Sequence, residues 1–346
     1  PPYVRVHNLK EQYNSVKKYS FANNGMTDLY IVFFEIGLKM LNKNGILCYI
    51  TPNSFCNSLA GTELRRYLQR EKNLETLIDL GHYQAFSVTT YTIISKIFNN
   101  RKFIKCRYYK YNEKNAKAEF VTDINYEDLF IDGKIVLSRD NRPFKKYFDF
   151  VVPKNPRVQV KNAFATLNDE VFIQNDFGFN GNIIDVLKAS TGQWKKCIYP
   201  YDSEGKLTPF ERLDVNTQDY FNKKKHLLVK DGKKIDSLWY GFGRTQAIKD
   251  VFKDKISINT TIKDIDSIKL NLVKTGQGIY SGLYMITDTP FEVIEEKIRS
   301  ISFLDYLRSL NKCKSGGYYT FSSKELAKYI NSELQEDEQS KIFGNY

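Results

Sequence analysis

The residues best suited to chemistry in this sequence are the first three, Pro1-Pro2-Tyr3. A proline has a carbonyl oxygen but no N–H, so two prolines in succession present acceptors without a competing donor. Acceptors of this kind suit the exocyclic amine of a base, because hydrogen bonds to its N–H groups help to release the nitrogen lone pair. The ring of Tyr3 could stack on a base taken out of a duplex. The alternative is an ordinary turn, since Pro-Pro-aromatic sequences are common in turns.

A second pair with chemical potential is Arg244 and Gln246, which follow a Gly-Phe-Gly turn. A guanidinium can bond two acceptors on guanine, and a glutamine amide can pair with the donor and acceptor of adenine. Both side chains could instead hold phosphates or the turn itself, because phosphate contacts outnumber base contacts in protein–DNA complexes. The sequence leaves base reading and backbone positioning open.

Residues 101–111, RKFIKCRYYKY, interleave basic and aromatic side chains. Such a segment could hold phosphates and stack bases. The other interpretation is a solvated edge strand that its lysines protect from pairing.

Metal chemistry finds little support in the sequence. Three histidines and five cysteines without CxxC spacing form no ligand pattern, and scattered cysteines indicate reduced thiols inside a cell. A nuclease needs carboxylates and a lysine around a divalent ion. Two groups have that composition, Asp264, Asp266 and Lys269, and Glu295, Glu296 and Lys297. Charge runs like these are usually solvated, so we expect no metal site in this chain.

The charge balance favours a polyanionic partner. The chain of 346 residues has 52 basic and 40 acidic side chains, a net charge of +12, and residues 1–112 hold 16 of the former against 7 of the latter. No apolar run approaches the roughly 20 residues of a membrane span, and no signal peptide opens the sequence. A cytoplasmic protein without a membrane partner is therefore expected.

The elements that must position these residues alternate in the first third of the chain. Apolar spacing predicts helices over 28–43 and 62–71, and short apolar runs predict strands over 46–50, 74–80 and 90–98, the first of them buried and parallel. Strands that alternate with helices indicate an α/β sheet. Three strands are few for such a sheet, so the other half is expected upstream.

Further along, periodicity weakens over 113–152, as in a linker, and a second region follows. Its short apolar runs lie at 171–173, 227–229, 256–258 and 283–286, and a helix is expected over 323–332.

The order of motifs from residue 1 to about 100 resembles the second half of a γ-class adenine-N6 DNA methyltransferase. Pro1-Pro2-Tyr3 resembles that family's [NDS]-P-P-[YFW] motif, although the polar residue before the prolines is absent. The matching segments that follow it are Asp28-Leu29-Tyr30, Phe33-Phe34-Glu35, Asn44-Gly45-Ile46-Leu47, Thr51-Pro52-Asn53-Ser54-Phe55, Leu64-Arg65, Ile78-Asp79-Leu80-Gly81 and residues 85–94.

The resemblance implies roles for four residues. Tyr3 would stack on a flipped adenine, Phe86 would contact its other side, and the carbonyl of Pro1 beside Pro2 would accept from the adenine amine. The methyl donor would be S-adenosylmethionine, whose glycine-containing motif is absent from the sequence, so the chain alone is expected to be inactive.

The second region resembles the C-terminal specificity domain of type IIG restriction-modification enzymes. Residues 165–173 look like its opening hairpin, and four further segments follow in the same order, at 239–246, 255–259, 278–284 and 316–322. The resemblance places DNA contacts on Arg244, Gln246, Lys255, Asn259, Tyr280 and Ser281. In that family a nuclease that needs Mg²⁺ lies at the N-terminus, outside this chain.

These inferences combine into one expectation. The fold would be α/β, the C-terminal half of a Rossmann-like methyltransferase sheet over 1–112, then a linker over 113–152 and an α+β target-recognition domain over 153–346. The function would be sequence-specific binding of double-stranded DNA and adenine-N6 methylation in a type II restriction-modification system. The alternatives are a DNA-specificity module without catalysis, or a methyltransferase for protein glutamine or RNA. Protein partners are left unspecified.

Overall fold

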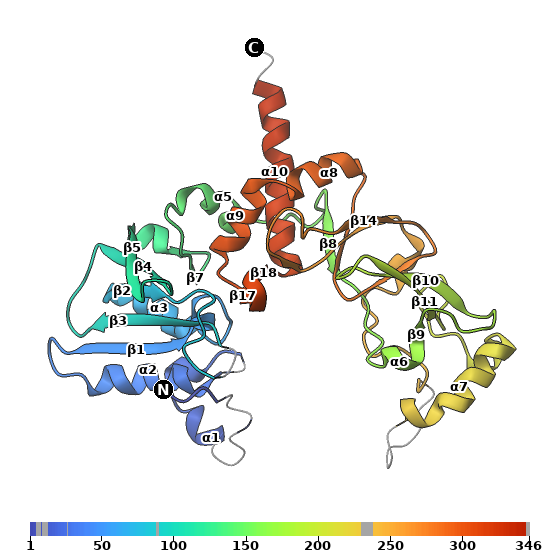
Figure 1. Ribbon diagram of the computed structural model, residues 1–346, viewed down its shortest axis with the longest axis horizontal. Coiled ribbons are helices and arrows are strands. Elements are labelled where there is room, and N and C mark those ends of the chain that lie inside the picture. The colour runs from blue at the N-terminus through green and yellow to red at the C-terminus, as the bar shows by residue number, and fades with distance from the viewer. Residues whose placement is uncertain (5–7, 9–12, 26, 88–89, 230–237, 344–346) are drawn as a thin grey trace. The chain divides into compact units, whose positions relative to one another are not determined.

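The computed structural model describes residues 1–4, 8, 13–25, 27–87, 90–229 and 238–343 (Figure 1). The chain forms two compact units, which are described separately. The first contains residues 1–151 and 304–321, and the second contains residues 152–303 and 322–346.

The first unit is built on a five-stranded sheet whose strands lie in the order β1-β3-β2-β4-β5. These strands are β1 (Ile46–Pro52), β2 (Leu74–Asp79), β3 (Thr92–Phe98), β4 (Lys105–Asn112) and β5 (Lys117–Asn125). β3 runs antiparallel to both β1 and β2, whereas β2 and β4 are parallel. β1, β2 and β4 therefore point the same way, and their carboxyl ends meet at one edge of the sheet.

Two helices pack their apolar positions into the core of this unit. They are α2 (Leu29–Met40), which contributes Tyr30, Ile31 and Phe34, and α3 (Thr62–Glu71), which contributes Leu64 and Leu68. The predictions of helices at 28–43 and 62–71 are confirmed. α3 ends because Lys72 adopts a left-handed conformation with φ 51°.

The first unit also contains several smaller elements. They are α1 (Tyr13–Val16), η2 (Ser20–Ala22), η3 (Asn53–Cys56), α4 (Tyr126–Leu129), β6 (Phe130–Ile131), β7 (Lys134–Ile135), α5 (Arg142–Asp149), the end of α9 (Ile301–Ser309), β17 (Cys313–Lys314), η6 (Ser315–Gly317) and β18 (Tyr318–Thr320).

Three expectations about this region were wrong. β1 is not a buried parallel strand, because the antiparallel β3 lies between it and β2, and Ile46 is 49% exposed. The segment 101–111 is not an edge strand, because β4 lies between β2 and β5. Residues 113–152 are not a linker, since β5 pairs with β4 and the elements up to residue 151 belong to the first unit.

The second unit holds two four-stranded sheets, ordered β15-β10-β11-β9 and β14-β12-β16-β8. Their strands are β8 (Gln159–Asn162), β9 (Ile173–Gln174), β10 (Ile183–Lys188), β11 (Gln193–Ile198), β12 (Lys255–Ile258), β14 (Leu270–Val273), β15 (Gly278–Tyr280) and β16 (Leu283–Ile286). The other elements are α6 (Asp169–Phe172), η4 (Phe210–Arg212), α7 (Val215–Leu228), η5 (Lys249–Phe252), β13 (Thr261–Ile262), α8 (Phe291–Ile298), the start of α9 and α10 (Ser323–Phe343).

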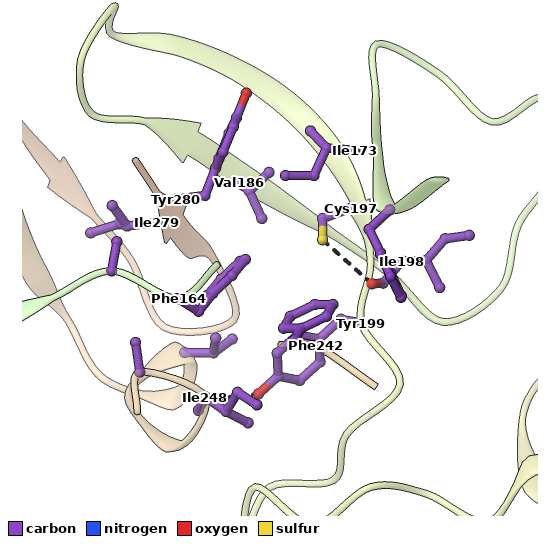
Figure 2. Close-up of a cluster of buried hydrophobic side chains, with 14 of the residues drawn as sticks. Phe164, Ile173, Val186, Cys197, Ile198, Tyr199, Phe242, Ile248, Ile279 and Tyr280 are labelled. Carbon is purple, nitrogen blue, oxygen red and sulfur yellow. Dashed lines mark hydrogen bonds between the residues drawn. The ribbon is translucent and has the colours of Figure 1, made fainter. Parts of the chain in front are cut away.

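An aromatic core holds the first of these sheets together (Figure 2). The rings of Phe164 and Phe242 stack with centroids 5.0 Å apart, and Tyr199 packs beside them while its hydroxyl donates to the carbonyl of Ile248 at 2.8 Å. Aromatic pairs of this kind stabilise a core beyond the area that they bury. The stacked rings hold two chain segments in place, the one that follows Ala163 and the one that precedes Arg244.

The expected hairpin at 165–173 is not present. Asn168 instead begins a helical turn, α6, because its carbonyl accepts from the N–H groups of Val171 and Phe172 at 3.1 and 3.2 Å. Thr166 donates from its hydroxyl to the carboxylate of Asp169, which closes the same turn. Residues Thr-x-x-Asp are typical of a helix start, and the turn competes here with strand pairing.

Candidate functional site

The structure brings Tyr3 and Phe86 together although 82 residues separate them in the chain. Their ring centroids lie 5.6 Å apart with an angle of 85° between the planes. Tyr3 is partly buried and Phe86 is 40% exposed, so one face of the pair is open to solvent. The sequence analysis predicted that both rings belong to one base-binding site, and their contact is compatible with that prediction.

Tyr3 is anchored to the carboxyl end of β1. Its hydroxyl donates to the carbonyl of Ile50 at 2.7 Å, and its ring meets the edge of Tyr30 with centroids 6.2 Å apart. The backbone N–H of Leu29 donates to the carbonyl of Val4 at 2.8 Å and ties the segment to the start of α2. Pro1 and Pro2 belong to this anchored segment, and no described residue donates a backbone hydrogen bond to their carbonyl oxygens.

Two further residues support this site and were not assigned a role from the sequence. The hydroxyls of Tyr30 and Ser54 lie 2.9 Å apart, and burial raises the pKa of Tyr30 well above its usual range, so it stays protonated. The only sequence signal for either was its place in a matched motif. A resemblance of motifs gives positions, but it does not give hydrogen-bond partners.

Several buried polar atoms near the end of β1 lack partners among the described residues. They are the hydroxyls of Thr51 and Thr92 and the side-chain nitrogen of Asn53. Thr92 pairs with Pro52 across the strands, so these atoms gather around one strand end. Buried polar atoms without partners are rare and each calls for an explanation. A polar ligand at this edge would supply one.

Arg65 fixes the loop that follows β1. Its side chain is 6% exposed and donates to the carbonyls of Phe55 and Ser58, both at 2.7 Å, and also to the carbonyl of Gly133. Burial lowers the pKa of Arg65. The loop is tight, because a Cβ at Gly61 would lie 2.3 Å from the carbonyl oxygen of Phe55.

In the second unit, three of the predicted DNA contacts lie exposed around one short segment. Arg244 pairs its backbone with Ala165, Gln246 donates from its side chain to the carbonyl of Ala163 at 3.3 Å, and the carbonyl of Gly282, next to Ser281, accepts from the N–H of Ala163 at 3.1 Å. All three predicted contacts are exposed. We call Arg244, Gln246 and Ser281 the polar rim.

The other three predicted DNA contacts are buried and have structural roles. Lys255 is 5% exposed and donates to the carbonyls of Lys253 and Gln277, both at 2.8 Å. Asn259 is 4% exposed and bonds the backbones of Thr261, Ser267 and Lys269.

Tyr280 is 4% exposed and belongs to the aromatic core shown in Figure 2. In this structure none of these three residues presents its side chain to a partner, so their assignment as DNA contacts is not supported.

Lys255 illustrates why the sequence misled. Burial lowers its pKa to about 8, although Asp250 and Asp254 attract its charge. Lysine side chains are ordinarily exposed to solvent, and the sequence interpretation assumed this for Lys255. Here the inward side of a fully buried strand, β12, holds it.

The described residues contain no group of three or more histidine, cysteine, aspartate or glutamate side chains that could hold a metal ion. Asp264, one of the acidic candidates, accepts instead from the N–H of Ser267 at 2.9 Å. Within the part of the chain that the structure covers, no helix is long and apolar enough to cross a membrane.

Comparison with protein families finds a match in the first part of the first unit. The model of the Eco57I restriction-modification methylase family matches residues 1–86. These residues form an Eco57I-type restriction-modification methylase domain. The match begins at the proline pair and ends at Phe86, so both rings of the candidate site fall within this domain.

Relatives of the methylase domain extend the similarity into the second unit. The chain is 34% identical over 315 residues to the Type II restriction enzyme and methyltransferase RM.Eco57I of Escherichia coli, which covers 74% of this chain and 31% of that protein. It is 26% identical over 137 residues to the Type II methyltransferase M.BanIII of Aneurinibacillus aneurinilyticus, covering 38% of this chain and 23% of that protein. The chain thus spans a third or less of these relatives.

A solved structure has the same fold. The Type IIL restriction-modification enzyme MmeI, determined in complex with DNA, aligns with a TM-score of 0.62 at 14% identity, over 100% of this chain and 49% of that one. At this identity the likeness shows the fold alone.

Proposed function

We propose that the first unit captures a target adenine of double-stranded DNA for methylation at N6, and that the second unit recognises the DNA sequence around it. The observation that carries the proposal is the Tyr3–Phe86 pair at the carboxyl end of β1. In open α/β sheets, ligands bind outside the carboxyl ends of the strands. The relatives' names supply the reaction class, methyl transfer in a restriction-modification system.

A base between the two rings requires a small movement. Stacked bases repeat at about 3.4 Å, so two rings that sandwich a base lie about 6.8 Å apart and parallel. The observed rings are 5.6 Å apart and perpendicular. Because the Tyr3 hydroxyl is bound to Ile50 and Phe86 is the more exposed ring, Phe86 would turn aside as the base enters. The carbonyl of Pro1 would then accept from the adenine amine.

S-adenosylmethionine would supply the methyl group. Binding of such a nucleotide-like group commonly uses a glycine-rich turn from a strand into a helix. β1 leads instead into the Asn53–Cys56 turn, and β2 leads into a single glycine, Gly81. The described residues do not fit this group, and we assign it no contact here.

The product of the intact protein tests the proposal. Duplex DNA incubated with the protein and labelled S-adenosylmethionine should yield N6-methyladenine after digestion to nucleosides. Methylated cytosine in its place would refute the adenine assignment, and label on protein glutamine or RNA alone would favour the other methyltransferases. Tight duplex binding without any methylation would favour a specificity module that lacks catalysis.

The polar rim is the proposed DNA-reading surface of the second unit. Arg244 has no side-chain hydrogen bond to any described residue, so its guanidinium is free to bond a base or a phosphate. Replacing Arg244 by alanine should weaken duplex binding about 5- to 150-fold if it reads a guanine, since a bidentate base contact contributes about 1–3 kcal/mol. The measurement is a duplex titration at several salt concentrations.

A change at Arg212 provides the matched control, because Arg212 is also exposed and its loss removes the same charge. Arg212→Ala should have a small effect. If Arg244 holds a phosphate instead, its loss should weaken all sequences alike and lower the salt dependence by about one released ion. Equal affinities for the Arg244→Ala, Arg212→Ala and unchanged proteins would refute a role for the polar rim.

A further inference from the structure

A cavity of about 610 Å³ lies in the first unit, outside the carboxyl ends of the parallel strands β2 and β4. Neither Tyr3 nor Phe86 lines it. Its walls come from the ends of both strands, from residues 137–144 and from the 304–321 segment. The lining residues used below are Asp79, Tyr108, Asn311, Tyr83, Tyr111 and Tyr319.

The cavity contains a buried carboxylate with a free oxygen. Asp79 is 6% exposed, and its Oδ1 accepts from the N–H of Gly81 at 2.9 Å, whereas no described residue bonds its Oδ2. Burial raises the pKa of Asp79, while the Gly81 N–H and the charge of Lys110 lower it. The Oδ2 of Asp79 is thus available to a ligand, and an N–H group of that ligand could donate to it.

Two further polar groups of the wall have unmet hydrogen-bonding capacity. Tyr108 is 1% exposed and its hydroxyl has no partner, and Asn311 is 5% exposed and its side-chain nitrogen has none. Asp79 and Tyr108 both line the cavity, from the neighbouring strands β2 and β4. The wall thus offers an acceptor, a donor and a hydroxyl that can serve as either.

Aromatic rings form the sides of the cavity. Tyr83 and Tyr111 lie with ring centroids 4.7 Å apart, and Tyr319 meets the ring of His82 at 5.7 Å. A cavity of this volume that is lined by aromatic rings and a few polar groups is typical of sites for small organic ligands.

The charge of the wall argues against a phosphate. Three cationic residues, Lys110, Arg139 and Arg308, face four acidic ones, Asp79, Glu113, Asp140 and Asp305. One of the cations is already paired, because Arg308 lies 2.8 Å from Asp305. The recognised group is therefore a ring with hydrogen-bonding edges and not an anion.

We propose that this cavity binds a heterocyclic base, which stacks on the tyrosine rings, donates from an amino group to Asp79 and accepts from Asn311. Adenine, guanine and cytosine carry an amino group next to an acceptor, whereas thymine has no amino group. The site is separate from the one proposed for the target adenine, and its argument does not depend on that function. The base could belong to a free nucleoside or to the bound DNA.

Titration of the intact protein with adenosine, guanosine, cytidine and thymidine, followed by ligand-observed NMR, tests the site. An amino-bearing nucleoside should bind more tightly than thymidine. Tyr108→Phe should weaken it about 3- to 10-fold, the size of one hydrogen bond. Because the Tyr108 hydroxyl has no partner in the free protein, its removal breaks no existing hydrogen bond. Asn311→Asp replaces the donor by an acceptor and should weaken binding about 10-fold or more.

Ser95→Ala is the matched control, because the Ser95 hydroxyl is also buried and unpartnered but does not line the cavity. Nucleoside binding should be unchanged in this variant. The proposal is overturned if no nucleoside binds up to about 10 mM, if thymidine binds as well as the others, or if Tyr108→Phe and Asn311→Asp bind like the unchanged protein.

The affinity of the same variants for duplex DNA shows whether the bound base belongs to the DNA or to a free nucleoside. Weaker duplex binding by Tyr108→Phe and Asn311→Asp would assign the site to a base of the bound DNA. Unchanged duplex binding together with lost nucleoside binding would assign it to a free nucleoside. Failure to form N6-methyladenine would count against the proposed function and would leave the nucleoside result intact.

Discussion

Replacing Tyr3 by alanine should weaken capture of the target base about 5- to 150-fold, because aromatic stacking on a base contributes about 1–3 kcal/mol. The loss also removes the bond to Ile50 and the edge contact with Tyr30, both of which hold the segment of Pro1 in place. A duplex with 2-aminopurine at the target position reports the capture, since its fluorescence rises when the base leaves the stack. Methylation by the intact protein should fall in parallel.

Two further variants separate the ring from its hydroxyl. Tyr3→Phe keeps the stacking surface and loses only the hydrogen bond to Ile50, so its effect should be about 10-fold or less. Phe86→Ala removes the opposite face and should resemble Tyr3→Ala. Unchanged 2-aminopurine fluorescence and methylation in both alanine variants would refute the proposed site. A loss in Tyr3→Phe as large as in Tyr3→Ala would show that anchoring, not stacking, is the main role of Tyr3.

Loss of Arg65 should have the largest effect on stability in the first unit. Arg65→Met would leave the carbonyls of Phe55, Ser58 and Gly133 without this donor, and the bond to Phe55 is buried. Buried acceptors without partners cost about 1–3 kcal/mol each. After allowance for the lower desolvation cost of methionine, we expect a loss of about 3 kcal/mol in the free energy of unfolding. Urea titration monitored by circular dichroism measures it.

The neighbouring arginine offers a matched control. Arg66 is 68% exposed on its side chain and forms a surface ion pair with Glu63 at 2.7 Å. Arg66→Met should change the free energy of unfolding by no more than about 0.5 kcal/mol, since exposed ion pairs contribute little. Equal losses in the two variants would contradict the assigned role of Arg65, because burial of the guanidinium would then make no difference.

Local patterns predicted the helices better than the strands. α2 and α3 carry apolar residues at helical spacing, and α3 ends at Lys72, which has a positive φ. β4 was not recognised as an inner strand, nor β5 as a strand, because most of their residues are exposed or only partly buried. The order of the strands depends on pairing over long distances, as when β3 inserts between β1 and β2. No local pattern encodes that insertion.

The candidate sites were predictable to different degrees. Tyr3 and Phe86 came from the order of motifs, and the structure places their rings in contact. In the second unit the motifs gave the segments but not the direction of each side chain. Lys255 and Asn259 satisfy backbone groups from inside the fold, whereas Arg244 points outward from a neighbouring segment. Alternation along short, irregular strands is too brief to decide which side is buried.

The anchoring of Tyr3 also determines how the sheet could grow beyond β1. The carbonyl of Gly45 and the N–H of Asn53 bond to the β3 side, at Asn99 and Tyr91, so even-numbered residues of β1 direct their backbone groups away from β3. On that outer side, Pro52 has no N–H, and the acceptor of Ile50 is already occupied by the Tyr3 hydroxyl.

A strand added along this edge could therefore pair with the amino-terminal part of β1, but the pairing would have to end before Ile50. The gap between the two strands beyond that point would lie beside the ring of Tyr3. The bond from the Tyr3 hydroxyl to Ile50 thus limits strand pairing at this end of β1, beside the site that we propose for the base.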